Sequence, residues 1–267
     1  MVRFIYDVAE IAAKYHLLVD YHGVYKPTGL QRTYPNAINF EGVHGLETMK
    51  WLGREHDQLT YDVTIPFIRA VAGPMDYTPG AMRNAQRDEY YPDYSRPMSQ
   101  GTRCHQLAMY VVYNQPLAML CDSPTAYEKE PEYTKFLAEI PTVWDEWDAI
   151  EGVIGEYIVV RCVKGNDLYY AGLNGNTKRD ITINFGFIGC GADQWHYGDI
   201  DVYRDKLASS TGYKHVRIET NGSLNIIGNN FPEKLTIRMA PGGGFVIKTH
   251  RRTMKDLQQS TFIEWTK

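Results

Sequence analysis

The segment Leu18-Val-Asp-Tyr-His-Gly-Val-Tyr-Lys-Pro-Thr-Gly-Leu-Gln-Arg-Thr-Tyr-Pro-Asn36 begins inside one short apolar run and leads to a second. The first run is His16-Leu-Leu-Val-Asp20 and the second is Ala37-Ile-Asn-Phe-Glu41. Both have the form of parallel strands that are buried on both faces and end in an acidic residue. A later run, Ala118-Met-Leu-Cys-Asp122, repeats this form. The pattern predicts parallel strands with acids at their carboxyl ends.

Helices are predicted around these strands. Apolar residues recur at three-to-four spacing from residue 2 to about 16, which predicts an amphipathic helix. Two more helices are predicted, at residues 102–113 and 133–140. Strands alternating with helices are typical of a (β/α)8 TIM barrel, in which chemistry gathers at the C-terminal strand ends. Residues 1–150 supply only about four of the eight strands, so we expect the C-terminal half of a barrel, whose unpaired edges would favour association.

The periodicity changes to two from about residue 152. Strands are predicted at 157–163, 168–173, 180–185, 215–219, 234–239 and 244–248. Turn signals such as Asn174-Gly175 and Asn221-Gly222 separate them. The expected fold class is therefore α/β plus all-β, with an antiparallel β-sandwich at 151–250 after the partial barrel at 1–150. Residues 251–267 form a tail, either a short helix or a disordered end.

Composition excludes several classes of function. The net charge is −4, so there is no excess of cations for nucleic acid or an anionic membrane surface. The first residues lack the uninterrupted apolar stretch of a signal peptide, and no window approaches a membrane span. The four cysteines lie far apart without a Cys-x-x-Cys pair, so we expect buried free thiols rather than a zinc site.

Residues 18–36, 40–42 and 45–47 together hold three carboxylates, a histidine, an arginine and several aromatic rings that could stack on sugars. Glycoside hydrolysis needs one carboxylic acid to protonate the leaving oxygen and a second carboxylate to act as nucleophile or to activate water. This combination suggests a carbohydrate-cleaving site.

The order of these residues resembles the catalytic-domain motif of glycoside hydrolase family 97, which cleaves α-linked galactosides or glucosides. Further motifs in the same order extend the resemblance over about residues 1–250: Gly73-Pro-Met-Asp-Tyr-Thr-Pro-Gly80, Gly101-Thr-Arg-Cys-His-Gln-Leu-Ala108, Pro141-Thr-Val-Trp-Asp145 and Met239-Ala-Pro-Gly-Gly-Gly-Phe245. The resemblance implies an N-terminal β-sandwich, a central barrel and a C-terminal β-sandwich. This chain is then expected to be the C-terminal part of a larger enzyme.

The resemblance also implies roles for individual residues. Glu47 occupies the position of the general acid, and Glu41 matches a position that binds calcium near that acid, so we expect a calcium ion at Glu41 and Glu47. Taken alone, Glu47 would be a solvated carboxylate at a helix start, and Glu41 would pair with Arg32. The expected substrate-binding residues are Asp20, His22, Arg32, Tyr34 and Asp76. Structural roles stay open for several of them, such as core packing for Tyr34 and a turn for Asp76.

The second catalytic carboxylate is harder to assign to a residue of this chain. Inverting members of the family carry a glutamate directly after the motif histidine, whereas Gly23 follows His22 here. The resemblance therefore implies the retaining, α-galactosidase-like branch, whose nucleophilic aspartate would fall a few residues before Met1. Asp20 is the only substitute within the chain. Retention requires a second carboxylate about 5 Å from Glu47.

The sequence thus predicts the C-terminal half of a retaining α-galactosidase that acts on an oligosaccharide or another α-glycoside. Three alternatives stay open: an α-glucosidase of the same family, a carbohydrate-binding or structural fragment without turnover, and a fragment that works only with its missing half. Family members are typically exported, so the resemblance implies a periplasmic or secreted parent enzyme.

Overall fold

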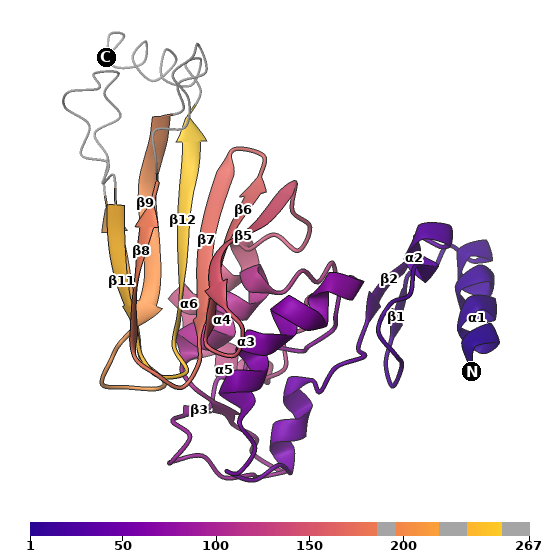
Figure 1. Ribbon diagram of the computed structural model, residues 1–267, viewed down its shortest axis with the longest axis horizontal. Coiled ribbons are helices and arrows are strands. Elements are labelled where there is room, and N and C mark those ends of the chain that lie inside the picture. The colour runs from indigo at the N-terminus through magenta and orange to yellow at the C-terminus, as the bar shows by residue number, and fades with distance from the viewer. Residues whose placement is uncertain (186–195, 219–233, 253–267) are drawn as a thin grey trace.

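The computed structural model describes residues 1–185, 196–218 and 234–252. A six-stranded antiparallel sheet is the centre of the molecule. A two-stranded sheet covers one of its faces and helices cover the other (Figure 1). The N-terminal helix and the first two strands lie at the far side of those helices, away from the large sheet (Figure 1).

The N-terminal unit consists of α1 (Val2–Lys14), β1 (Val19–Tyr21), α2 (Leu30–Thr33) and β2 (Ala37–Phe40). The predicted first helix and both predicted strands are confirmed. α1 buries Ile5, Ala9 and Ala12, and the first two of these pack with Tyr21 and Phe40 in a small core. β1 and β2 pair in parallel, with Asp20 opposite Asn39. Parallel pairing places the carboxyl ends of both strands at the same edge.

The middle of the chain is mainly helical. Its elements are η1 (Leu46–Lys50), α3 (Gln58–Ile68), η2 (Ala70–Ala72), β3 (Asn84–Ala85), β4 (Ser99–Gln100), α4 (Arg103–Val112), α5 (Pro124–Glu128) and α6 (Pro131–Glu139). The two helices predicted at 102–113 and 133–140 correspond to α4 and α6. Every residue of α4 is buried because this helix lies against β7 (Asp167–Asn174) and β12 (Gly244–Arg252) of the large sheet. The sequence did not predict α3.

The strand predicted at Ala118–Asp122 is wrong, because this stretch has no regular secondary structure. Its backbone bonds go to separate partners instead of a ladder: Met119 O accepts from the Tyr110 hydroxyl, and Cys121 N donates to Pro79 O. Among the described residues the parallel pairs are β1–β2 and β3–β4, which lie in separate two-stranded sheets. The half barrel therefore stays a prediction.

The predicted antiparallel strands are confirmed, and β5 and β9 are added to them. The large sheet has the order β10-β9-β12-β7-β6-β5, and the small sheet pairs β8 with β11. The remaining bounds are β5 (Glu146–Val153), β6 (Tyr157–Lys164), β8 (Arg179–Asn184), β9 (His196–Asp205), β10 (Tyr213–Ile218) and β11 (Lys234–Met239). β12 begins where it was predicted but runs on to Arg252, so it includes the first two residues of the predicted tail. The rest of the tail lies outside the described residues.

The central strands β6 and β7 of the large sheet are buried on both faces. Val159 and Val163 of β6 pack toward the small sheet, whereas Ile158 and Val160 pack with helix residues such as Leu107. Helices and sheet therefore share one core across residue 150, and the division into domains at that point stays a prediction.

The thiols agree only partly with the expectation. Cys104 and Cys162 are buried, Cys121 is exposed, and all three are free. Cys190 lies outside the described residues. None of the described helices combines the length and the hydropathy needed to cross a membrane.

Candidate active site

Three segments converge at the carboxyl ends of β1 and β2. Glu41 N donates to Tyr21 O at 2.7 Å, which joins the two strand ends. Asp76 N donates to Phe40 O at 2.9 Å, so residues 75–78 lie beside the end of β2. Leu46 N donates to Tyr77 O at 3.0 Å, which places the start of η1 against the same segment. The result is a shared edge that carries the predicted acids.

Asp20, His22 and Asp76 come together at this edge. One ligand atom from each lies within 4.8 Å of the others, and His22 Nε2 is 2.5 Å from Asp76 Oδ2. Asp76 is fully buried, Asp20 is partly buried and His22 is exposed. Three of the five predicted substrate-binding residues therefore form one polar group between solvent and the interior.

Three of the four carboxylate oxygens of this group lack a hydrogen-bond partner in the part of the chain that the structure describes. Both Asp20 oxygens and Asp76 Oδ1 are buried without a hydrogen bond. Burial, together with the negative charge of Asp76, raises the pKa of Asp20 to about 6. Burial lowers the pKa of His22, but the hydrogen bond to Asp76 and the nearby carboxylates outweigh it, so that the pKa lies above its usual value. Unpaired buried acceptors of this kind suit a ligand with several hydroxyl donors.

Glu41 follows β2 and is tied to the loop after β1. Its Oε2 accepts from Gly23 N at 2.6 Å. Gly23 has φ +63°, a left-handed conformation that glycine adopts without a steric penalty. The alternative pair between Glu41 and Arg32 does not form.

Calcium takes about six to eight oxygen ligands. Within the described part of the chain, the only close group of three or more His, Cys, Asp or Glu side chains is Asp20, His22 and Asp76. Glu41 and Glu47 belong to no such group, so by themselves they do not make a complete calcium site.

Glu47 lies in the first turn of η1, after Gly45, and its side chain is exposed. It lines a cavity of about 590 Å³ together with Thr78 and residues of the loop around Arg96. An exposed carboxylate on the wall of a cavity can exchange a proton with a group that is bound there.

Arg32 and Tyr34 do not join this group. Arg32 is exposed on α2 and makes no side-chain hydrogen bond or ion pair in the described residues. Tyr34 packs edge-on against Tyr6 of α1, with ring centroids 6.3 Å apart. Tyr34 therefore contacts the N-terminal core, in agreement with the alternative prediction of a packing role.

A buried polar network, which no sequence pattern predicted, supports the segment that carries Asp76. The Tyr77 hydroxyl donates to Asp62 and accepts from Gln58. Asp62 Oδ2 is 3.2 Å from His105 Nε2, and His105 Nδ1 is 3.0 Å from Gly243 O. The four side chains are fully buried. The network joins the site to the turn before β12, and no local pattern marks residues from four separate segments as neighbours.

Two family models match the chain. The model for glycoside hydrolase 97 matches residues 1–43, and the model described as glycosyl-hydrolase 97 C-terminal, oligomerisation, matches residues 143–250. A retaining α-galactosidase of Bacteroides thetaiotaomicron is 49% identical over 252 residues, which are 93% of this chain. The chain belongs to glycoside hydrolase family 97. The expected family is thus confirmed.

Relatives of this family 97 chain include a probable retaining α-galactosidase of Streptomyces bingchenggensis, 30% identical over 64% of the chain and 24% of the relative. Among solved structures, a family 97 enzyme of Pseudoalteromonas sp. strain K8 in complex with panose matches with a TM-score of 0.74 and 27% identity, over 91% of this chain and 36% of that one. The same enzyme in complex with acarbose matches with a TM-score of 0.71. The chain spans 36% of the length of the Bacteroides relative.

Proposed function

We propose that this chain forms the acid/base side of a retaining α-galactosidase. The observation that carries the proposal is the convergence of Asp20, His22 and Asp76 at one strand edge, with Glu47 on a segment bonded to the same loop. The 49% identity to a retaining α-galactosidase over 93% of the chain supports this assignment.

Each residue has a separate part in the proposed reaction. Glu47 protonates the glycosidic oxygen as the leaving group departs and then, as a base, activates the water that releases the sugar. The unpaired oxygens of Asp20 and Asp76 accept hydrogen bonds from sugar hydroxyls. His22, held by Asp76, donates to a further hydroxyl. Arg32 and Tyr34 stay candidates only if a substrate extends toward α2.

The nucleophile is proposed to lie outside these residues, on a preceding strand of a barrel whose second half this chain supplies. Asp20 is assigned to substrate binding instead, because its carboxylate lies together with His22 and Asp76. Calcium at Glu41 and Glu47 is a further part of the proposal, and the ion needs further oxygen ligands besides these two carboxylates. A periplasmic or secreted location is proposed on the same family grounds.

A chimera tests the proposed function. The part of the Bacteroides enzyme that matches this chain is replaced by the 267 residues, and release of the aryl group from an aryl α-galactoside is measured. We expect turnover that Glu47→Gln lowers by about a hundredfold or more, with the α-anomer of galactose as the first product. A chimera that is folded and active but unaffected by Glu47→Gln contradicts the proposed role of Glu47.

The isolated chain is the second arm of this test. We expect no turnover from it, with or without calcium. Clear turnover that is lost in Glu47→Gln would place the nucleophile within the chain and make Asp20 the leading candidate.

A further inference from the structure

The cavity beside Glu47 is lined by more cations than carboxylates. Besides Glu47, it is lined by three cations, Lys50, Arg83 and Arg96, and by one other carboxylate, Asp122. No ion pair joins any of the three cations to a carboxylate in the described ranges. Unneutralised cations that face a common cavity create a positive local potential.

The contacts of these cations leave their charge available. Lys50 Nζ lies 5.8 Å from the centroid of the exposed Tyr94 ring, and the exposed Arg96 side chain forms no ion pair with any residue that the structure describes. Arg83 donates to the backbone carbonyl of Arg96, which ties the two ends of the loop together but leaves the guanidinium charge unbalanced. Asp122 is held by backbone donors, since its oxygens accept from Met82 N and Ser123 N.

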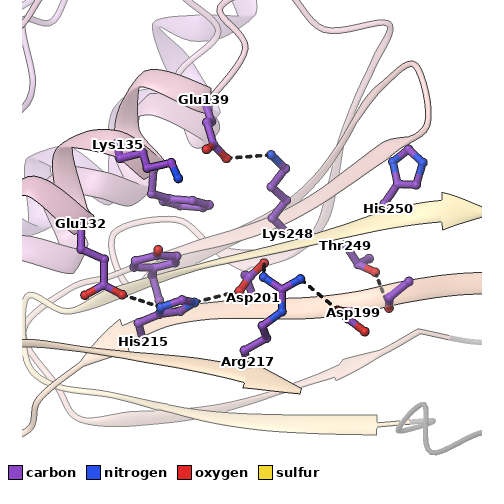
Figure 2. Close-up of a pocket in the computed structure, with 13 residues that line it drawn as sticks. Glu132, Lys135, Glu139, Asp199, Asp201, His215, Arg217, Lys248, Thr249 and His250 are labelled. Atoms are coloured by element: carbon purple, nitrogen blue, oxygen red, sulfur yellow. Dashed lines mark hydrogen bonds and ion pairs between the residues drawn. The ribbon is translucent and has the colours of Figure 1, made fainter. Parts of the chain in front are cut away.

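In a second cavity that is lined by charged residues, a histidine and a lysine contact carboxylates. This cavity has a volume of about 380 Å³ and lies between α6 and strands β9, β10 and β12 (Figure 2). There, His215 lies 2.6 Å from Glu132 and 2.8 Å from Asp201, and Lys248 lies 3.1 Å from Glu139. His215 and Lys248 are thus already matched by carboxylates, whereas the described part of the chain gives no such partner to the cations beside Glu47.

We propose that the cavity beside Glu47 binds the leaving-group side of the substrate, and that this part is a saccharide with an anionic group. The inference rests on the proposed function, since it takes Glu47 as the acid that faces the leaving group. Arginine offers a planar pair of donors that matches a carboxylate or a sulfate ester, and lysine adds a point charge. The exposed Tyr94 ring beside Lys50 offers a face for a sugar ring. The substrate class is therefore a galactoside linked to a uronic acid or to a sulfated sugar.

Binding to the 267-residue chain tests the inference without requiring turnover. A ¹⁵N-labelled sample is titrated with methyl α-glucuronide, with glucose 6-sulfate and with neutral methyl α-glucoside, and chemical shifts of Lys50, Thr78 and Arg96 are followed. We expect at least one anionic sugar to bind about tenfold more tightly than the neutral one, with the advantage shrinking as salt is added. The carboxylate and sulfate arms identify which anion is preferred.

Single substitutions test which of the cations binds the anionic group of the sugar. Arg96→Gln and Lys50→Gln should each weaken binding of the anionic sugar about two- to fivefold and leave the neutral sugar unaffected. Lys214→Gln, an exposed lysine on β10, is the matched control and should change nothing. Arg83→Gln is less suitable because Arg83 also holds the loop.

Two results overturn the inference. One is equal affinity for neutral and anionic sugars, and the other is an equal loss of binding in Lys214→Gln, which would mark a diffuse charge effect. Inorganic sulfate that binds as tightly as the sugar sulfate would also overturn the saccharide assignment. The binding titration does not measure turnover, so failure of the chimera in the galactosidase assay would leave its results unchanged. Conversely, loss of the preference for anionic sugars would leave the galactosidase proposal intact.

Discussion

His22 Nε2 and Asp76 Oδ2 lie 2.5 Å apart although 54 residues separate them in the sequence. The contact forms because β1 ends beside β2, and the Asp76 amide is bonded to the last residue of β2. It orients an exposed imidazole by means of a buried carboxylate. This pair is the part of the candidate site that can be tested most directly in the isolated chain.

Replacing Asp76 should weaken the hydrogen bond that orients the His22 ring. Asp76→Asn removes the negative charge and weakens the hydrogen bond that raise the pKa of His22, so that pKa should fall toward its usual value. The measurement is an NMR titration of the His22 ring. Asp167→Asn, which removes the partner of His250, is the matched control and should leave His22 unchanged. An unaltered His22 pKa in Asp76→Asn would show that the contact does not persist in solution.

Asp20 should make stability depend on pH. Its pKa is raised from 3.8 to about 6, so the folded state binds this proton more tightly than the unfolded state. The free energy of unfolding should therefore fall as pH rises through this window. Asp20→Asn removes the effect and should stabilise the protein by about 1 kcal/mol at pH 7.5, after allowance for solvent screening, with almost no change at pH 4.

Urea unfolding at both pH values measures this difference. Asp180→Asn is the control of opposite sign, because the hydrogen bond from Arg238 lowers the pKa of Asp180. That variant should lose a little stability at neutral pH, and the loss should disappear in acid. The account of Asp20 is wrong if its variant is equally stabilised at both pH values.

The Tyr77 hydroxyl should stabilise the segment next to Asp76. Tyr77→Phe deprives the buried Asp62 and Gln58 of a hydrogen-bond partner and should lower the free energy of unfolding by about 1–3 kcal/mol. Hydrogen exchange at the Leu46 amide, which is bonded to Tyr77 O, should become faster. Tyr94→Phe is the control, since the Tyr94 ring is largely exposed. Equal stability of the two variants would argue against a supporting role for the network.

Gly101 should be required where the helical part meets the sandwich. A Cβ at this position would lie 2.5 Å from Gly242 O, and the φ of +88° is itself unfavourable for other residues. Gly101→Ala should therefore destabilise the protein by the backbone strain of about 1–2 kcal/mol plus about 1–3 kcal/mol of overpacking. Gly165→Ala isolates the strain, because Gly165 has φ +55° and nothing within 4 Å of its Cβ. Thermal unfolding of both variants should give a larger loss for Gly101→Ala, and equal losses would contradict the steric argument.

Calcium should bind weakly to the isolated chain. Glu41 and Glu47 provide few oxygens, so we expect a dissociation constant of about 10⁻⁴–10⁻³ M, near the weak end for protein sites. Isothermal titration of calcium into the chain measures it, and Glu41→Gln should abolish it. Binding that survives Glu41→Gln but is lost in Asp20→Asn would move the metal to the group formed by Asp20, His22 and Asp76.

Local sequence patterns predicted much of the fold. Alternating apolar residues marked β6, β7, β8, β10, β11 and β12, and the apolar runs at 16–20 and 37–41 marked β1 and β2. The same reasoning failed at Ala118–Asp122, where Met119, Leu120 and Cys121 are exposed and the backbone bonds to separate partners instead of a strand, because an apolar run alone does not decide between a buried strand and a loop. Strand β5 was missed because most of its residues are exposed and its pattern does not alternate.

The sequence by itself determined the family, the type of most elements and the presence of Asp20, His22 and Glu41 near two strand ends, because periodicity and motif order are local properties of the chain. Only the tertiary structure decided that Asp76 meets His22, that Arg32 and Tyr34 lie apart from them, and that Lys50, Arg83 and Arg96 surround Glu47 without carboxylate partners. These relations join residues from separate segments, and their distances depend on how strands pair and helices pack rather than on spacing along the chain.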